Sequence, residues 1–355
     1  MNYIGSKLSL LKFLDESISK IVDSDCKIFC DLFAGTGTVG AYFKKKGFQI
    51  IANDIQYYSY ILNKHYISNH ELLSFTGLEN LIPQICQLPT KAKSVLVCDY
   101  LSSLEGVSGF VFNNYCLGGT KDSKFERQYF SDYNGKKCDA IRKTIEEWFN
   151  SSIITENEYY YLLAVLLESI DKYANTASVY GAFLKHLKKT AQKELQLKPL
   201  EIIVNDNHHE VYNQDINTLI SQIQGDILYL DPPYNHRQYG ANYHLLETIA
   251  RYDTPTISGK TGLRKYENEK SKYCSPIYAK KSFKELISNA NMKYIFVSYN
   301  NEGVLSLEDI KEIMSSRGKY GFFTQEYNRF KADRDENRGY SAKSTTEYLH
   351  YAIVE

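Results

Sequence analysis

Between Lys27 and Val39 the chain reads KIFCDLFAGTGTV, a short apolar strand followed by a glycine-containing turn and the start of a helix. A second apolar segment, Phe48 to Asn53, ends at Asp54, and a third candidate strand, Ser94 to Cys98, ends at Asp99. Strands that alternate with helical patterns are typical of a parallel sheet. We therefore expect an α/β fold.

The middle of the chain has a different pattern. Asp139 to Phe149 and Tyr159 to Ser169 carry apolar residues at helical spacing, and Phe183 to Leu197 reads as a basic helix. Strand signals then return in four segments, which are Glu201 to Val204, Asp226 to Leu230, Lys293 to Ser298 and Glu347 to Val354. We expect a core of residues 1–100 and 201–355, interrupted by a helical insertion at residues 101–200.

The glycine turn DLFAGTG, Asp31 to Gly37, has the chemistry of a cofactor site. A nucleotide-type cofactor needs close approach to the backbone at the end of the first strand, which Gly35 and Gly37 permit. Asp54, at the end of the second strand, can accept hydrogen bonds from ribose hydroxyls. Together with Gly40 the turn spells GxGxxG, so a nicotinamide or flavin dinucleotide has to be considered.

Two residues in this turn favour S-adenosylmethionine (SAM) over a dinucleotide. Asp31 supplies a carboxylate for the ammonium group of SAM, and Phe33 supplies an aromatic wall for its adenine. A turn that serves only to pack a strand against a helix is the remaining interpretation of this motif.

A second motif, Asp231-Pro232-Pro233-Tyr234, follows the apolar strand that ends at Leu230. The exocyclic amino nitrogen of adenine is a poor nucleophile because its lone pair is delocalised into the ring. Asp231 and the Pro232 carbonyl can accept hydrogen bonds from both amino hydrogens, which favours tetrahedral geometry at nitrogen, and the two prolines stiffen the turn. Tyr234 offers a flat face for a base extruded from the duplex. A strand-capping turn is the alternative for this motif taken alone.

Together these motifs resemble the SAM-dependent DNA adenine methyltransferases of the class that includes the bacterial Dam enzymes. The chain is most similar to the FokI-type modification methyltransferases of restriction systems. The segments that resemble the FokI-type group are Arg127 to Phe130 (RQYF), Ala174 to Thr176 (ANT), Asn235 to Tyr239 (NHRQY) and Tyr243 to Glu247 (YHLLE), and Val297 to Asn300 (VSYN) is similar to the late core strand of the family. The FokI enzyme itself has two such halves and this chain has one, so we expect it to modify one kind of strand site.

The resemblance implies a Rossmann-like SAM-dependent methyltransferase sheet with a largely helical DNA-recognition insertion. It implies SAM as cofactor and S-adenosylhomocysteine as product, and it extends the cofactor site to Tyr3, Lys7, Asp215 and Asp231. The catalytic residues that it implies are Asp231, Pro232, Pro233 and Tyr234.

The composition is that of an ordinary globular protein, with 355 residues, 43% of them hydrophobic and 24% charged. Seven scattered cysteines predict reduced thiols rather than disulfides or a zinc site, and we expect no metal. The chain lacks a long apolar stretch and a signal-peptide core, so we expect a cytoplasmic protein with no membrane association.

Charge is distributed unevenly along the chain. The 42 basic and 42 acidic residues balance, yet residues 181–200 hold five lysines against one glutamate, and residues 258–284 hold eight basic residues against two acidic ones. These segments predict contacts with the DNA backbone, although solvated helix or loop faces would look the same. The candidate DNA-binding residues are Lys185, Lys188, Lys189, Arg237, Gln238, Lys260, Arg264 and Lys265.

The sequence therefore predicts a site-specific adenine-N6 methyltransferase acting on double-stranded DNA, as a monomer, with a possible restriction endonuclease that acts separately. An RNA or cytosine-N4 amino methyltransferase is the alternative within the class. A dinucleotide-dependent oxidoreductase and a non-catalytic DNA-binding protein are the alternatives outside it.

Overall fold

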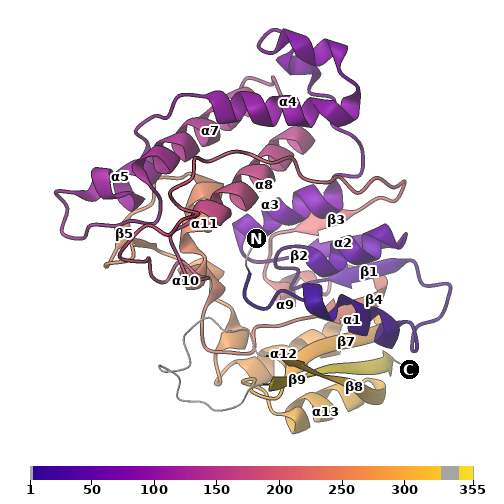
Figure 1. Ribbon diagram of the computed structural model, residues 1–355. Helices are drawn as coiled ribbons and strands as arrows, with labels where there is room; N and C mark the ends of the chain where they lie inside the picture. Colours follow the sequence, from indigo (N-terminus) through magenta and orange to yellow (C-terminus); the bar gives the residue numbers. More distant parts are fainter. Residues whose placement is uncertain (1–2, 329–343, 355) are drawn as a thin grey trace. The chain divides into compact units, whose positions relative to one another are not determined.

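A computed structural model describes residues 3–328 and 344–354 (Figure 1). The chain divides into two compact units. The sheet unit comprises Ile4–Asn63, Asn205–Gln238 and Glu269–Glu355, and the helical unit comprises Met1–Tyr3, Lys64–Val204 and Tyr239–Asn268. Residues 64–100 and 239–268 thus group with the helical unit, whereas the expected core contained them.

The sheet unit is built on a seven-stranded sheet in the order β3-β2-β1-β4-β7-β9-β8. All neighbours pair in parallel except β9, which is antiparallel to both β7 and β8. The strands are β1 (Ile28–Asp31), β2 (Gln49–Asn53), β3 (Glu210–Tyr212), β4 (Gly225–Leu230), β7 (Met292–Asn300), β8 (Gly318–Asn328) and β9 (Ser344–Val354). The helices are α1 (Leu11–Ile18), α2 (Thr38–Lys45), α3 (Tyr57–Asn63), α9 (Ile216–Leu219), α12 (Ala279–Asn289) and α13 (Leu307–Ser315).

Alternate strand residues face opposite sides of this sheet. Cys30, Leu228 and Ile295 are in register on three neighbouring strands and belong to one buried cluster with side chains of α12 and α13. The residues between them face the other side, where Phe29 of β1 stacks on Phe43 of α2 with ring centroids 4.1 Å apart. The sheet is therefore buried on both faces, as parallel sheets require, and the predicted Rossmann-like methyltransferase sheet is confirmed.

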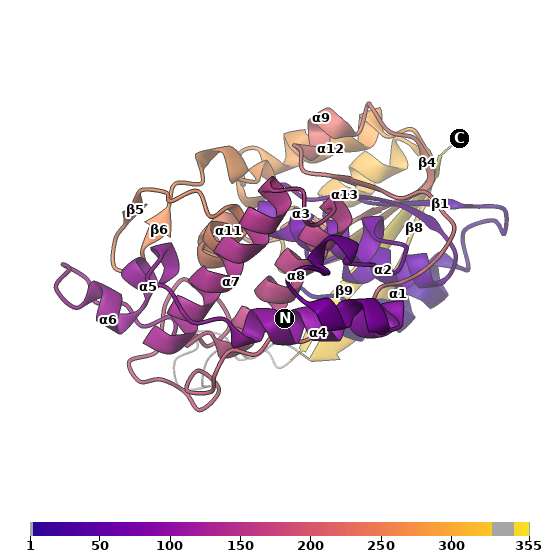
Figure 2. The ribbon, with the colours of Figure 1, turned by 90° about the horizontal axis from the view of Figure 1, so that it is seen from above.

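The helical unit contains a pair of long helices, α7 (Asp132–Asn150) and α8 (Glu156–Tyr173), which lie side by side (Figures 1 and 2). Ser131 caps α7, and Thr155 begins α8 with a capping box, so both helices start where the sequence supplies side-chain acceptors. The other elements are α4 (Thr90–Ser103), α5 (Phe110–Tyr115), α6 (Leu117–Thr120), α10 (Tyr239–Asn242), α11 (His244–Arg251) and the hairpin of β5 (Ile257–Ser258) and β6 (Leu263–Arg264).

Three secondary-structure predictions were wrong. Ser94 to Cys98 lies inside α4, because a short apolar run fits a helix as well as a strand. Glu201 to Val204 forms no strand, and the sheet instead takes β3 from residues further along the chain. Phe183 to Leu197 forms no helix, because two side chains bind its backbone: Asn175 accepts from the Lys188 amide and Asn134 accepts from the Leu195 amide.

The other strand and helix predictions are confirmed, with boundaries moved by a few residues. All seven cysteines are free of disulfides. No helix in the part of the chain that the structure describes is long and apolar enough to cross a membrane.

Candidate active site

The candidate site lies at the carboxyl edge of the sheet, where β1 has β2 on one side and β4 on the other. The chain order reverses here, and such a switch point is where open α/β sheets bind ligands. Asp31 ends β1, Asp54 follows β2 and Asp231 follows β4. Because Asp31 pairs in register with Tyr229, the first and last of these carboxylates lie near each other, and the charge of Asp231 acts on the pKa of Asp31.

The glycine turn after β1 needs residues without a side chain. Gly35 and Gly37 have φ angles of 52° and 76°, in the left-handed region that favours glycine. The Gly35 amide donates to Asp54 Oδ2 at 2.8 Å, and its carbonyl accepts from Asn63 at 3.0 Å. The turn is thus fixed by polar contacts.

Asp31 is the clearest indication of a ligand-binding site at this edge. Its side chain is 1% exposed. One oxygen, Oδ2, accepts from the Gly40 amide at 3.1 Å, whereas Oδ1 has no hydrogen-bond partner among the described residues. Burial raises the pKa of this carboxyl to about 8. A buried carboxylate with one open acceptor fits a cationic group such as the ammonium of SAM.

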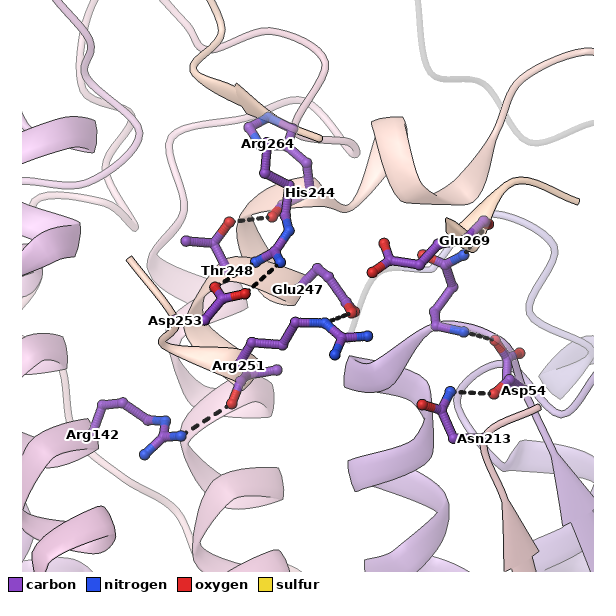
Figure 3. A network of polar contacts seen from close by, with 12 residues as sticks. Asp54, Arg142, Asn213, His244, Glu247, Thr248, Arg251, Asp253, Arg264 and Glu269 are labelled. Atoms are coloured by element: carbon purple, nitrogen blue, oxygen red, sulfur yellow. Dashed lines mark hydrogen bonds and ion pairs between the residues drawn. The ribbon is translucent and has the colours of Figure 1, made fainter. Parts of the chain in front are cut away.

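Three other predicted cofactor residues of the sheet unit, Asp54, Phe33 and Asp215, are each held by hydrogen bonds or ring contacts. Asp54 accepts from the Gln56 amide at 2.9 Å, and Asn213 donates to its main-chain carbonyl at 2.7 Å (Figure 3). Phe33 meets the ring of Tyr273 edge to face, with centroids 5.0 Å apart. Asp215 caps α9 by accepting from two backbone amides, which is a structural use of its carboxylate.

The DPPY motif forms the turn after β4. The side chain of Asp231 is 16% exposed, and burial raises its pKa to about 6, although the Lys7 ammonium opposes this effect. Lys7 Nζ lies 3.0 Å from Asp231 Oδ1 and 5.9 Å from the centre of the Tyr234 ring. The ring of Tyr234 meets Tyr299 edge to face at 6.3 Å. Its carbonyl accepts from the Val304 amide at 3.0 Å, so the loop after β7 supports the motif.

The structure adds two residues to this site, Glu347 of β9 and Ser298 of β7. Lys7 donates to Glu347 Oε1 at 2.6 Å, and the Ser298 hydroxyl donates to the same oxygen at 2.6 Å. The side chain of Glu347 is only 3% exposed. Sequence reasoning missed both residues, and the only available signal was a charged residue at the start of an apolar strand.

Residues 3–313 match the family described as D12 class N6 adenine-specific DNA methyltransferase. This chain belongs to that family. It is 52% identical over 352 residues to the type II methyltransferase M.NlaIII of Neisseria lactamica, covering 99% of this chain and 98% of that protein. It is 35% identical to the type II methyltransferase M.CviAII of Paramecium bursaria Chlorella virus 1, covering 100% and 99%.

The similarity to M.FokI of Planomicrobium okeanokoites differs in extent. The identity is 40% across 99% of this chain but only 52% of that protein, so this chain spans about half of its length. The predicted resemblance is therefore confirmed. As a D12-class methyltransferase, the protein uses SAM to methylate the N6 nitrogen of adenine in DNA.

Three other predicted site residues of this D12-class enzyme differ in their contacts: one is stacked on a ring, one is hydrogen-bonded to the backbone and one is exposed. In the helical unit, Tyr3 stacks on Tyr243, with ring centroids 4.7 Å apart. In the sheet unit, the Gln238 amide exchanges two hydrogen bonds with the backbone of Ser271, at 3.1 and 2.8 Å, which braces the loop after the DPPY motif. Arg237 is exposed on the same loop.

The predicted DNA-binding residues of the helical unit divide into two groups. Lys185, Lys189, Lys260 and Lys265 are exposed. By contrast, Arg264 is 6% exposed and forms a two-pronged ion pair with Asp253 at 3.0 and 2.8 Å (Figure 3), and Lys188 Nζ donates to the Thr176 carbonyl.

The described residues contain no group of three or more His, Cys, Asp or Glu side chains that could hold a metal ion. The carboxyl edge offers a glycine turn without side chains, the buried carboxyl of Asp31 with one oxygen unpartnered, the partly buried carboxyl of Asp231 beside Lys7, and the ring of Tyr234. These features can bind a cationic, nucleotide-like molecule and place an acceptor at an amino group.

Proposed function

We propose that the turn from Asp231 to Tyr234 is the catalytic centre at which this enzyme methylates an adenine flipped out of duplex DNA. The observation that carries the proposal is the pair of buried carboxylates at neighbouring strand ends. Oδ1 of Asp31 has no hydrogen-bond partner among the described residues, and Oδ1 of Asp231 contacts the Lys7 ammonium at 3.0 Å. One can receive an ammonium group and the other an amino hydrogen.

The chemistry at adenine requires an acceptor rather than a strong nucleophile. Asp231 accepts one hydrogen of the adenine amino group, and the Pro232 carbonyl accepts the other. This directs the nitrogen lone pair out of the ring and toward the methyl group. Pro233 stiffens the turn, and Tyr234 stacks on the base, which has to leave the duplex to reach the site.

SAM, when bound, supplies a methyl group on a sulfonium, which is electrophilic without a metal. Asp31 holds the ammonium group of SAM, and Asp54 binds its ribose hydroxyls. Because Gly35 and Gly37 have no side chains, SAM can approach the protein backbone of this turn closely. The further residues proposed for the cofactor site are Tyr3, Lys7, Phe33 and Asp215. Asp231, which the resemblance also assigns to that site, is proposed to act on the adenine. The matching S-adenosylhomocysteine product lacks the positive charge at sulfur.

We further propose that the helical unit and the 258–284 segment hold the DNA. The supporting observation is that Lys260 is exposed at the tip of the β5–β6 hairpin. Arg127 fixes this tip by donating to the carbonyls of Gly259 at 2.9 Å and Lys260 at 3.1 Å, and Tyr115 donates to the Gly262 carbonyl at 2.8 Å. A rigid, basic hairpin fits contact with the phosphate backbone.

The names of the relatives support a role in restriction–modification. M.NlaIII and M.CviAII are both named type II methyltransferases, and each is matched over nearly its whole length. The proposed role is therefore that of a modification enzyme, acting as a monomer, with any restriction endonuclease acting separately.

The proposal is tested with Asp231→Ala and Asp231→Asn, assayed for methyl transfer to DNA and for SAM binding by calorimetry. Both variants should bind SAM within about threefold of wild type while losing at least about a hundredfold in kcat, because the amide and the methyl lack the anionic acceptor. The matched control is Asp226→Asn on the same strand, which carries its carboxylate at the opposite end and should retain activity. Wild-type turnover in Asp231→Ala would refute the proposed centre.

A further inference from the structure

Glu347 reaches the catalytic edge because β9 runs against its neighbours. The parallel strands β4 and β7 end at the carboxyl edge, so an antiparallel strand must begin there. Leu230 pairs with Val297, and Ser298 pairs with Leu349, two residues after Glu347. By alternation, Asp231, Ser298 and Glu347 therefore lie on the same face of three adjacent strands.

Lys7 is shared unequally between the two carboxylates on this face. Its hydrogen bond goes to Glu347 Oε1 at 2.6 Å. Its contact with Asp231 Oδ1 is longer, at 3.0 Å, and through this contact the ammonium lowers the pKa of Asp231 against the effect of burial. Lys7 is 6% exposed, so water does not compete strongly for its ammonium.

From this geometry we infer that Glu347 is a positioning residue for methyl transfer: it takes the shorter contact of Lys7 and so weakens the hold of Lys7 on Asp231, whose oxygen can then accept from the adenine amino group. The inference rests on the catalytic role proposed for Asp231. Ser298 fixes Glu347 for this task by donating to the same oxygen.

The alternative is that Glu347 only neutralises the buried Lys7. The two interpretations differ in the effect that Glu347 has on the pKa of Asp231. The titratable groups that face Asp231 are Lys7 before the first helical turn, Tyr229 and Tyr234 of the β4 segment, Asp31 of β1 and Glu347 of β9. Burial raises the pKa of Asp231 most, and Glu347 raises it further by repulsion. If Glu347 is neutralised, Lys7 turns to Asp231 and the pKa of Asp231 falls.

Glu347→Gln tests the inference by separating catalysis from binding and from folding. We expect kcat to fall about tenfold, because Lys7 then contacts Asp231 more closely and competes with the adenine amino group, while the affinity for SAM stays within about threefold of wild type. The acid limb of kcat against pH should move to lower pH by about half a unit or more. Glu347→Asp keeps the charge and should recover part of the kcat and part of the pH profile.

The matched control is Glu326→Gln on β8, which removes the same charge from an exposed position next to the register partner of Glu347 and should change neither kcat nor the acid limb. A wild-type kcat and pH profile in Glu347→Gln would overturn the inference, as would a loss of kcat with the acid limb unmoved. If Glu347→Gln does not fold, a folded Glu347→Asp with wild-type kcat and pH profile overturns it instead. The catalytic proposal fails separately, through activity in Asp231→Ala.

Discussion

Asp31 carries a carboxyl that folding buries without giving both of its oxygens a partner. Such a group destabilises the free protein and is retained where a ligand compensates for it. In the native state its pKa is about 8, above the ordinary value of 3.8, so folding favours the protonated acid. The stability that this protonation provides is complete below pH 3.8 and is lost as the pH rises toward 8.

Asp31→Asn should therefore raise the melting temperature of the SAM-free protein, and the rise should be larger at about pH 8 than at about pH 5. The same change should weaken SAM binding by about tenfold or more, because the amide cannot pair with an ammonium group. Thermal unfolding at the two pH values and calorimetric titration with SAM measure the two effects. An equal or lower melting temperature at both pH values, or unchanged affinity, would contradict the role given to Asp31.

In the proposed mechanism Asp231 has to be ionised to accept the amino hydrogen of adenine, and its pKa is about 6. The carboxylate is present above this pH and is lost as the pH falls through it. We expect kcat/KM for DNA, measured at saturating SAM, to decrease about tenfold per pH unit below about pH 6. A rate that stays constant to about pH 5 in a folded enzyme would argue against Asp231 as the acceptor.

At the scale of elements, Arg127 makes the largest number of side-chain contacts to the tip of the β5–β6 hairpin, which Tyr115 also contacts. Arg127 binds the carbonyls of Gly259 and Lys260 and, through Nη1, the Asn114 carbonyl at 3.2 Å. Removal of this guanidinium releases the hairpin tip and leaves the sheet unit with all of its own contacts.

Arg127→Ala should weaken DNA binding by about tenfold or more while SAM affinity stays the same, because an unfixed hairpin has to be ordered on binding. Lys124→Ala is the control, since it removes one positive charge from an exposed position three residues away. Fluorescence anisotropy with a labelled duplex compares the variants. Equal DNA affinities for the two would mean that only charge matters at this position.

The elements also show what the sequence could predict. The strands β1, β4 and β7 were predictable because each is an apolar run followed by a turn or a polar residue at the carboxyl edge of the sheet. The segment at Phe183 to Leu197 was not, because its shape depends on Asn134 and Asn175, which bind its backbone from distant positions.

Some residues of the candidate site could be predicted from the sequence and others could not. Asp31 and Asp231 were predictable because each follows a strand in a recognisable motif. Glu347 was not, because it lies 340 residues from Lys7 and meets it only through the antiparallel pairing of β9.

At the scale of the whole molecule, the net charge of zero is the sum of acidic and basic segments that are separated along the chain. Residues 201–226 hold five acidic residues and no Lys or Arg, whereas the two basic segments lie on either side of the catalytic motif in sequence. On the proposed function, net neutrality limits indiscriminate attraction to DNA, and we expect the two basic segments to supply the contacts with its backbone.

The central claim is that the enzyme transfers the methyl group of SAM to the N6 nitrogen of adenine at a defined DNA sequence, with Asp231 as the acceptor for the adenine amino group. The direct test is sequencing of genomic DNA, with detection of modified bases, from cells that express the wild-type enzyme or Asp231→Ala. We predict N6-methyladenine at one short recurring sequence with the wild-type enzyme and none with the variant. Methylation that persists in Asp231→Ala, falls on cytosine, or shows no recurring sequence would contradict the account.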